Sequence, residues 1–147
     1  MRLRCAVTAK RLLLVEDEED LLWSLGRYLR TAFKGHEVLE ARTVQEGLDC
    51  AASGLDSLIT DVKVANESGI DLVLALRAKD PGLPCVVMTA FPTDADRANL
   101  ASMSRTRYVE KPFQPEALAS LLREVLSQKE NFVGHLDLDG LPDVLQL

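Results

Sequence analysis

Long apolar runs and an excess of positive charge are both missing from this 147-residue sequence. Its longest apolar runs have about five residues, whereas a helix that spans a bilayer needs roughly 20. The basic N-terminal segment has no apolar core of the kind that secretory signals carry. The formal net charge is −6, and binding to nucleic acid phosphates needs a basic surface. We therefore expect no contact with membranes and no nucleic-acid binding by this chain.

Paired cysteines are missing as well. Cys5, Cys50 and Cys85 lie far apart, their number is odd, and no CxxC pair occurs. This spacing argues against a disulfide framework and against a zinc site, and it favours reduced thiols in a cytoplasmic protein.

What the sequence does contain is an alternation of short apolar runs with longer amphipathic segments. Five runs are predicted to be strands: Arg11–Val15, His36–Ala41, Leu55–Thr60, Pro84–Thr89 and Arg107–Glu110. Helical spacing of apolar residues follows each strand, and five helices are expected: from Asp20 to Phe33, from Thr43 to before Gly54, Ile70–Lys79, Pro92–Met103, and from Pro115 to at least Leu126.

The ends of two of these helices carry recognisable signals. Thr43 with Glu46 three residues later is typical of a capping box, and Gly35 is placed to end the helix before it. Strict alternation of strand and helix predicts an α/β fold, a doubly wound parallel sheet with helices on both faces. For five strands the best match is the flavodoxin-like order 2-1-3-4-5.

Polar residues stand at the carboxyl ends of four predicted strands, the edge at which such sheets bind ligands. Glu16 and Asp17 follow the first strand, Asp61 the third, Thr89 closes the fourth and Lys111 follows the fifth. Three carboxylates this close repel one another, which raises the pKa of one of them unless a cation is present. Mg²⁺ characteristically takes carboxylate, water and phosphate oxygens, so we expect a magnesium site.

These residues and their mutual spacing resemble the receiver domains of two-component response regulators of the chemotaxis type. The similarity covers residues 11–128 and rests on four motifs: the acidic pair in LLLVEDE, the aspartate that closes LDSLITD, the threonine in VVMTA and the lysine in YVEKPF.

The resemblance implies a phosphorylation site at Asp61 that accepts a phosphoryl group from a histidine kinase or a phosphotransfer protein. Asp17, Asp61 and the backbone carbonyl of Lys63 would bind Mg²⁺ directly, and Glu16 would act through a water molecule.

It also implies roles for residues at the other strand ends. Thr89, with the backbone N–H of Ala90, and Lys111 would each bind a phosphoryl oxygen. Tyr108 would turn inward when Thr89 moves. The Lys111-Pro112 bond is expected to be cis.

One loop departs from the family pattern. Receivers usually place methionine and proline three and four residues after the phosphoacceptor, and here Val64 and Ala65 stand there, with the glycine kept at Gly69. The segment before the fifth strand, SMSRTRY, also lacks the usual small Gly-Ala pair. The family controls water access through the residues two after the aspartate and two after the threonine, which are Lys63 and Phe91 here.

The sequence suggests three candidate functions. The first is a phosphorylation switch that catalyses its own phosphoryl transfer and autodephosphorylation without being a conventional enzyme. It would signal to a protein partner through the face of the fourth helix, fifth strand and fifth helix, with a homodimer as a further possibility. The second is a pseudo-receiver that binds partners without phosphorylation. The third, a haloacid-dehalogenase-type hydrolase, needs an aspartate where VEDEED has Glu18, and room for a cap domain.

The domain organisation follows from the same resemblance. We expect an N-terminal extension at residues 1–10, a receiver domain at 11–128 and a C-terminal tail at 129–147. The stretch ENFVGHLDLDGLPDVLQL resembles the start of a PATAN-type partner-binding domain, which would make the chain a piece of a longer protein. The alternative is a loose tail.

Overall fold

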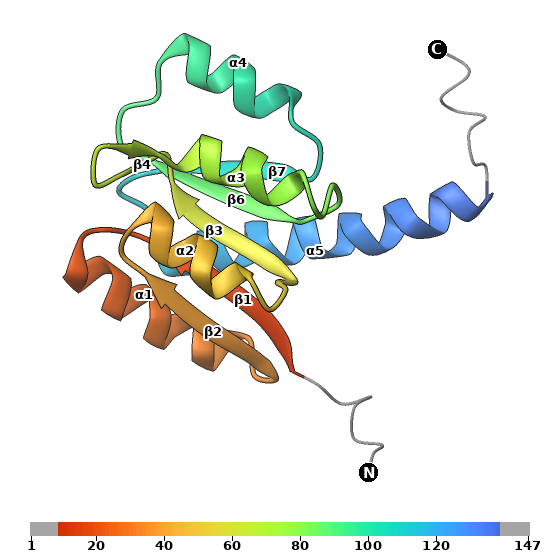
Figure 1. Ribbon diagram of the computed structural model, residues 1–147, viewed down its shortest axis with the longest axis horizontal. Coiled ribbons are helices and arrows are strands. Elements are labelled where there is room, and N and C mark those ends of the chain that lie inside the picture. The colour runs from red at the N-terminus through yellow and green to blue at the C-terminus, as the bar shows by residue number, and fades with distance from the viewer. Residues whose placement is uncertain (1–8, 139–147) are drawn as a thin grey trace.

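The computed structural model describes residues 9–138, with side chains described up to residue 128. Along the chain the elements are β1 (Lys10–Val15), α1 (Glu19–Ala32), β2 (His36–Ala41), α2 (Val44–Ala51), β3 (Ser57–Asp61), β4 (Lys63–Val64), β5 (Glu67–Ser68), α3 (Gly69–Arg77), β6 (Cys85–Thr89), α4 (Asp94–Ser102), β7 (Thr106–Glu110) and α5 (Pro115–Leu138) (Figure 1).

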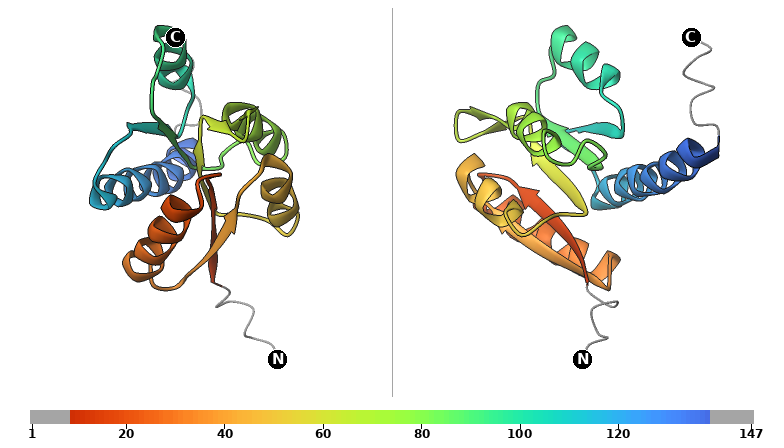
Figure 2. Two further views of the ribbon diagram at one scale, coloured as in Figure 1. Left: turned by 90° about the vertical axis from the view of Figure 1, so that its left-hand side faces the viewer. Right: turned by 45° about the vertical axis from the view of Figure 1, so that its right-hand side comes forward.

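The five longer strands form one parallel sheet in the order β2-β1-β3-β6-β7. Counted as the five predicted strands, this is the order 2-1-3-4-5, so the predicted fold is confirmed. The central strand β1 pairs with β2 and β3 at once, and Leu12 lies opposite Val38 on one side and Ser57 on the other. Helices α1 and α5 lie on one face of the sheet, and α2 and α3 lie on the other (Figure 2).

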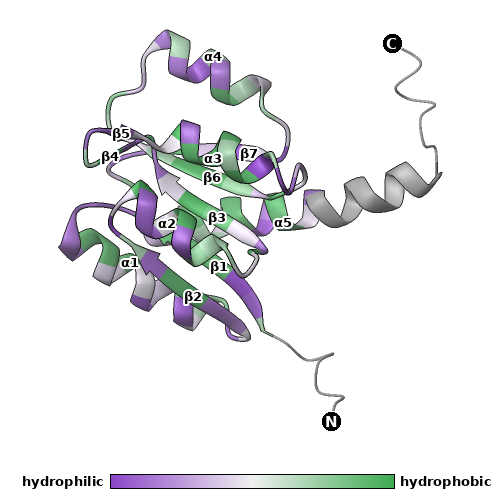
Figure 3. Ribbon diagram, in the orientation of Figure 1, coloured by the Kyte–Doolittle hydropathy of each residue, from purple (hydrophilic) through white to green (hydrophobic). Residues whose placement is uncertain are grey.

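Two hydrophobic clusters fill the space between the sheet and its helices. Successive side chains of a strand point to opposite faces, so Leu12 and Leu14 belong to the cluster under α1 and α5, whereas Leu13 and Val15 belong to the one under α2 and α3. All four are fully buried, and each such side chain contributes about 1.5–3 kcal/mol relative to exposure. In Figure 3, β6 is mostly hydrophobic, whereas hydrophobic and hydrophilic residues alternate along α1 and α2.

The helix ends show one correction and one addition. Thr43 Oγ1 accepts the Glu46 N–H as predicted, but the Glu46 carboxylate accepts the N–H of Arg42 instead of that of Thr43. The complete capping box lies at α4, where Thr93 and Asp96 each accept the other's backbone N–H. Sequence reasoning missed it because Pro92 suggested an earlier start for this helix.

Two features lie outside the predicted pattern. The segment between β3 and α3 forms a short antiparallel hairpin, β4 with β5. The last helix, α5, continues to Leu138, so the expected boundary at residue 128 falls inside a helix. Side chains of the proposed PATAN-like stretch lie outside the described residues, and the division into domains stays a prediction.

Within the described residues, no helix has the length and the apolar character needed to cross a membrane.

Candidate functional site

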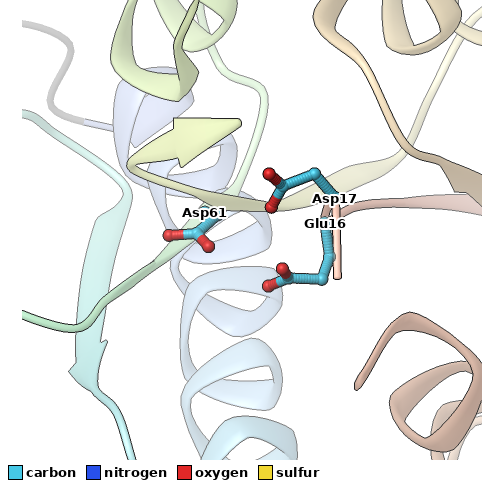
Figure 4. Close-up of side chains that lie close together, drawn as sticks. All are labelled: Glu16, Asp17 and Asp61. Atoms are coloured by element: carbon cyan, nitrogen blue, oxygen red, sulfur yellow. The ribbon is translucent and has the colours of Figure 1, made fainter. Parts of the chain in front are cut away.

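The carboxyl ends of β1 and β3 bring three carboxylates together, as predicted. Glu16, Asp17 and Asp61 each offer one oxygen, and these oxygens all lie within 4.8 Å of one another (Figure 4). Glu16 is 1% exposed and Asp61 8% exposed, whereas Asp17 lies nearer the surface. The cluster is therefore a partly desolvated acidic site in which one carboxylate, that of Asp17, is open to solvent.

Lys111 supplies the positive charge of the site from the end of β7. Its Nζ donates to Asp61 Oδ2 at 2.7 Å and to Glu16 Oε1 at 2.9 Å. The backbone N–H of Lys111 donates to the Thr89 carbonyl at 2.8 Å, which extends the ladder between β6 and β7 up to the site. The Lys111-Pro112 peptide bond is cis, as the resemblance implied.

Burial and charge act against each other in the pKa values of this cluster. Desolvation raises the pKa of Glu16, and the nearby charge of Asp61 adds to the rise, while the Glu18 N–H and Lys111 oppose it. Burial on its own lowers the pKa of Lys111, but its bonds to Asp61 and Glu16 outweigh this, so the pKa is raised. The expected raised carboxyl pKa is thus present, although burial is a larger cause than the like charges.

Backbone N–H groups fix two of the three carboxylates. Glu16 Oε2 accepts the Glu18 N–H at 2.9 Å. Asp17 Oδ2 accepts the N–H of Ala65 at 3.0 Å, from the turn between β4 and β5. Sequence reasoning missed this second donor, because it belongs to a hairpin whose strands are only two residues long.

A glycine lets the loop after Asp61 fold back onto its own start. The Gly69 N–H donates to the Val62 carbonyl at 2.7 Å. A Cβ at position 69 would lie 1.8 Å from the Asp61 carbonyl oxygen and 2.8 Å from Thr60 Oγ1. Only glycine fits this approach, which explains why the loop keeps its glycine although it lacks the methionine and proline of the family pattern.

Beside the carboxylates lies an open cavity of about 430 Å³. Its lining contains five residues that the sequence analysis named, together with a neighbouring valine and the aspartate of the α4 capping box: Asp61, Lys63, Thr89, Ala90, Phe91, Val62 and Asp96. Thr89 is buried, and Phe91 is exposed over 90% of its surface. The cavity joins the predicted phosphoacceptor to its predicted phosphoryl-binding residues, and Asp96 is the member that the sequence did not reveal.

Tyr108 lies in β7 opposite Val87 of β6. Its side chain is half-buried and packs against the hydrophobic cluster under α2 and α3. The predicted change in its orientation stays a prediction.

The donor set fits a magnesium ion. Carboxylate oxygens are hard ligands, and Lys111 pairs with Glu16 and Asp61 while leaving Asp17 without an ion-pair partner within the described residues. Asp17, Asp61 and the Lys63 carbonyl would hold the ion.

Comparison with known sequences gives one family. The sequence model for the response regulator receiver domain matches residues 12–123. Similar curated proteins include the uncharacterized transcriptional regulatory protein YkoG of Bacillus subtilis (strain 168), 34% identical over 118 residues, with 80% of this chain and 51% of YkoG covered. The response regulator SaeR of Staphylococcus epidermidis is 27% identical, with 88% and 58% covered. The chain spans about half the length of these relatives.

Solved structures agree with this result. A CheY-like response regulator receiver domain protein from Methanospirillum hungatei JF-1 superposes with a TM-score of 0.74 at 26% identity, over 84% of this chain and 98% of the other. The chemotaxis protein CheY4 of Vibrio cholerae gives a TM-score of 0.71 at 26% identity, over 80% and 98%.

Proposed function

Because this chain belongs to the response regulator receiver domains of two-component systems, we propose that it is a phosphorylation-dependent switch with Asp61 as the phosphoacceptor. The observation that carries the proposal is the bond from Lys111 Nζ to Asp61 Oδ2, at a carboxylate that also borders the Thr89 cavity. The donor is a histidine kinase or a phosphotransfer protein.

Each residue of the site has one role in the phosphoryl transfer. An oxygen of the Asp61 carboxylate attacks the phosphorus of a phosphohistidine; a P–O bond forms, the P–N bond breaks, and the imidazole nitrogen leaves with the electron pair. The transition state spreads negative charge over the equatorial oxygens. Lys111 binds one of these oxygens, and the Thr89 hydroxyl and Ala90 N–H bind another. Bound Mg²⁺ would neutralise further charge there.

The output is a change in protein binding on the face formed by α4, β7 and α5. Intramolecular ion pairs tie this face together: Arg97 of α4 reaches Glu110 of β7 at 3.7 Å, and Arg107 of β7 pairs with Glu124 of α5. Exposed pairs of this kind contribute little to stability, so a partner can exchange them at low cost. A downstream protein or a second copy of this chain would bind here.

Intact mass spectrometry tests the proposal. After incubation with acetyl phosphate and Mg²⁺, we expect one phosphoryl adduct on the wild type and none on Asp61→Ala. Asp71→Ala removes an exposed carboxylate at the start of α3 and should be modified like the wild type. A wild type that stays unmodified would favour the pseudo-receiver, and an adduct of equal yield on Asp61→Ala would refute the assignment of the phosphoacceptor.

A further inference from the structure

The turn between β4 and β5 bonds directly to a carboxylate of the acidic site. The N–H of Ala65 donates to Asp17 Oδ2 at 3.0 Å, across 48 residues of sequence. Glu16 and Asp61 are held by Lys111, and Glu16 also by the Glu18 N–H. Among the described residues, the Ala65 N–H is the one donor bonded to the Asp17 side chain. The carboxylate nearest to solvent therefore depends on this hairpin for its orientation.

The hairpin is anchored on both sides of the turn. Val64 is fully buried in the cluster under α2 and α3, and β4 pairs with β5 through Lys63 with Ser68 and Val64 with Glu67. At its base the Gly69 N–H donates to the Val62 carbonyl. Because the hairpin fixes the Ala65 N–H, this donor restricts the orientation of the Asp17 side chain and does not move with it.

The turn itself has an unusual backbone. Ala65 has φ +49° and Asn66 has φ +71°, which is the pattern of a two-residue type I′ turn. Asparagine tolerates this region, whereas alanine is disfavoured there because of its Cβ. Proline could not stand at position 65, because its φ is fixed near −65° and it has no N–H. The bond to Asp17 thus exists only because the usual proline of this loop is absent here.

We propose that Ala65 is a positioning residue that holds Asp17 in place for Mg²⁺ through its backbone N–H. This proposal rests on the proposed function of the site. A carboxylate has two oxygens with two lone pairs each, so one lone pair of Oδ2 can accept the N–H while the other oxygen binds the cation. A ligand that is already oriented loses less freedom on binding, and the bond should therefore raise the affinity for Mg²⁺.

Calorimetric titration with Mg²⁺ measures the effect on three variants. Ala65→Pro removes the N–H and the turn geometry, and we expect its Kd to rise about five- to tenfold, which corresponds to about 1–1.4 kcal/mol, near the net contribution of a typical hydrogen bond. Ala65→Gly keeps the N–H and relieves the positive φ, so its Kd should equal or fall below that of the wild type. Replacing Ala65 by lactic acid, which exchanges the amide for an ester, removes the N–H alone and should weaken binding like Ala65→Pro.

Hydrogen exchange of the metal-free protein tests the bond separately from the metal. In Asp17→Ala the amide of Ala65 should exchange several-fold faster, whereas the amide of Gly69, bonded to Val62, should be unchanged. Wild-type affinity in the ester variant, or tighter binding because the N–H competes with Mg²⁺, would overturn the positioning role while leaving the proposed function intact. A wild type that binds no Mg²⁺ would overturn both.

Discussion

Charge at the site is only partly compensated by the protein itself. Three carboxylates face one ammonium, and Lys111 bonds to the two that are buried. Lys111 now donates to a carboxylate oxygen of Asp61. A phosphoryl group on Asp61 would give Lys111 a more highly charged partner. We therefore expect Lys111 to pair with Asp61 in both states, and its raised pKa keeps it charged in the unmodified site.

We expect Lys63 and Phe91 to set how long the phosphorylated state lasts. Hydrolysis needs a water in line with the phosphorus, and both side chains border the cavity at Asp61. Neither offers an acceptor that orients a water. Phe91 is largely exposed, so it can lie over the phosphoryl group without disturbing the core. We expect the double variant Lys63→Asn with Phe91→Glu to lose its phosphoryl group about tenfold faster, a change of about 1.4 kcal/mol in the barrier.

The measurement is the decay of phosphorylated protein after removal of the donor, with Mg²⁺ present throughout. Leu74→Gln is a matched control, since Leu74 is exposed on α3 and does not line the cavity. Decay of the double variant at the wild-type rate, or more slowly, would show that these side chains do not control the access of water.

At the scale of the element, the segment between β3 and α3 depends on Gly69. We expect Gly69→Ala to lower the free energy of unfolding by about 1–3 kcal/mol, the usual cost of overpacking, because the new Cβ would overlap the Asp61 backbone. Phosphorylation should slow as well, since Asp61 itself must shift. Urea denaturation measures the first effect and the rate of adduct formation the second.

Gly82→Ala is the control for this change. The nearest atoms to a Cβ at position 82 are at 3.8 Å, on the Arg105 side chain, which is ordinary contact distance. Equal losses of stability in the two variants would mean that the close approach at Gly69 is not what destabilises the protein.

The sequence predicted those elements that have a strong periodic signal. The strand from His36 to Ala41 has the bounds that were expected, and β1 and β3 differ from prediction by one or two residues. The β4–β5 hairpin could not be predicted, because two-residue strands have no periodicity. The five chemical groups at the strand ends were placed correctly, since parallel strands bring their carboxyl ends to one edge. The places of the Ala65 N–H and of Asp96 at the site could not be predicted, because they depend on tertiary contacts that residue types do not reveal.

For the whole molecule, the prediction concerns transmission from the site to the output face. We expect the ring of Tyr108 to become more buried when beryllofluoride binds at Asp61, because Thr89 then moves toward the bound group. This is a population shift, so the bound group must interact better with the inward state. Fluorotyrosine incorporation gives a direct ¹⁹F NMR readout, and Tyr28→Phe assigns the resonance, since the chain contains two tyrosines.

Two variants separate this mechanism from a direct effect of the ligand. Thr89→Ala should bind beryllofluoride yet leave the Tyr108 resonance near its unmodified position, and Asp61→Ala should show no change at all. A Tyr108 resonance that shifts equally in Thr89→Ala and in the wild type would contradict coupling through Thr89.

The ion pairs of Lys111 join residues that are synthesised at different times, so they can form only late in folding. Lys111 lies 95 residues after Glu16 and 50 after Asp61. During synthesis, which proceeds from the N-terminus, Glu16 and Asp61 emerge long before the lysine that pairs with them. The site is complete only when β7, the outermost strand on its side of the sheet, has docked. A nascent or partly folded chain therefore has Asp61 but lacks the ammonium group of Lys111 beside it, and we expect it to accept no phosphoryl group until its last strand is in place.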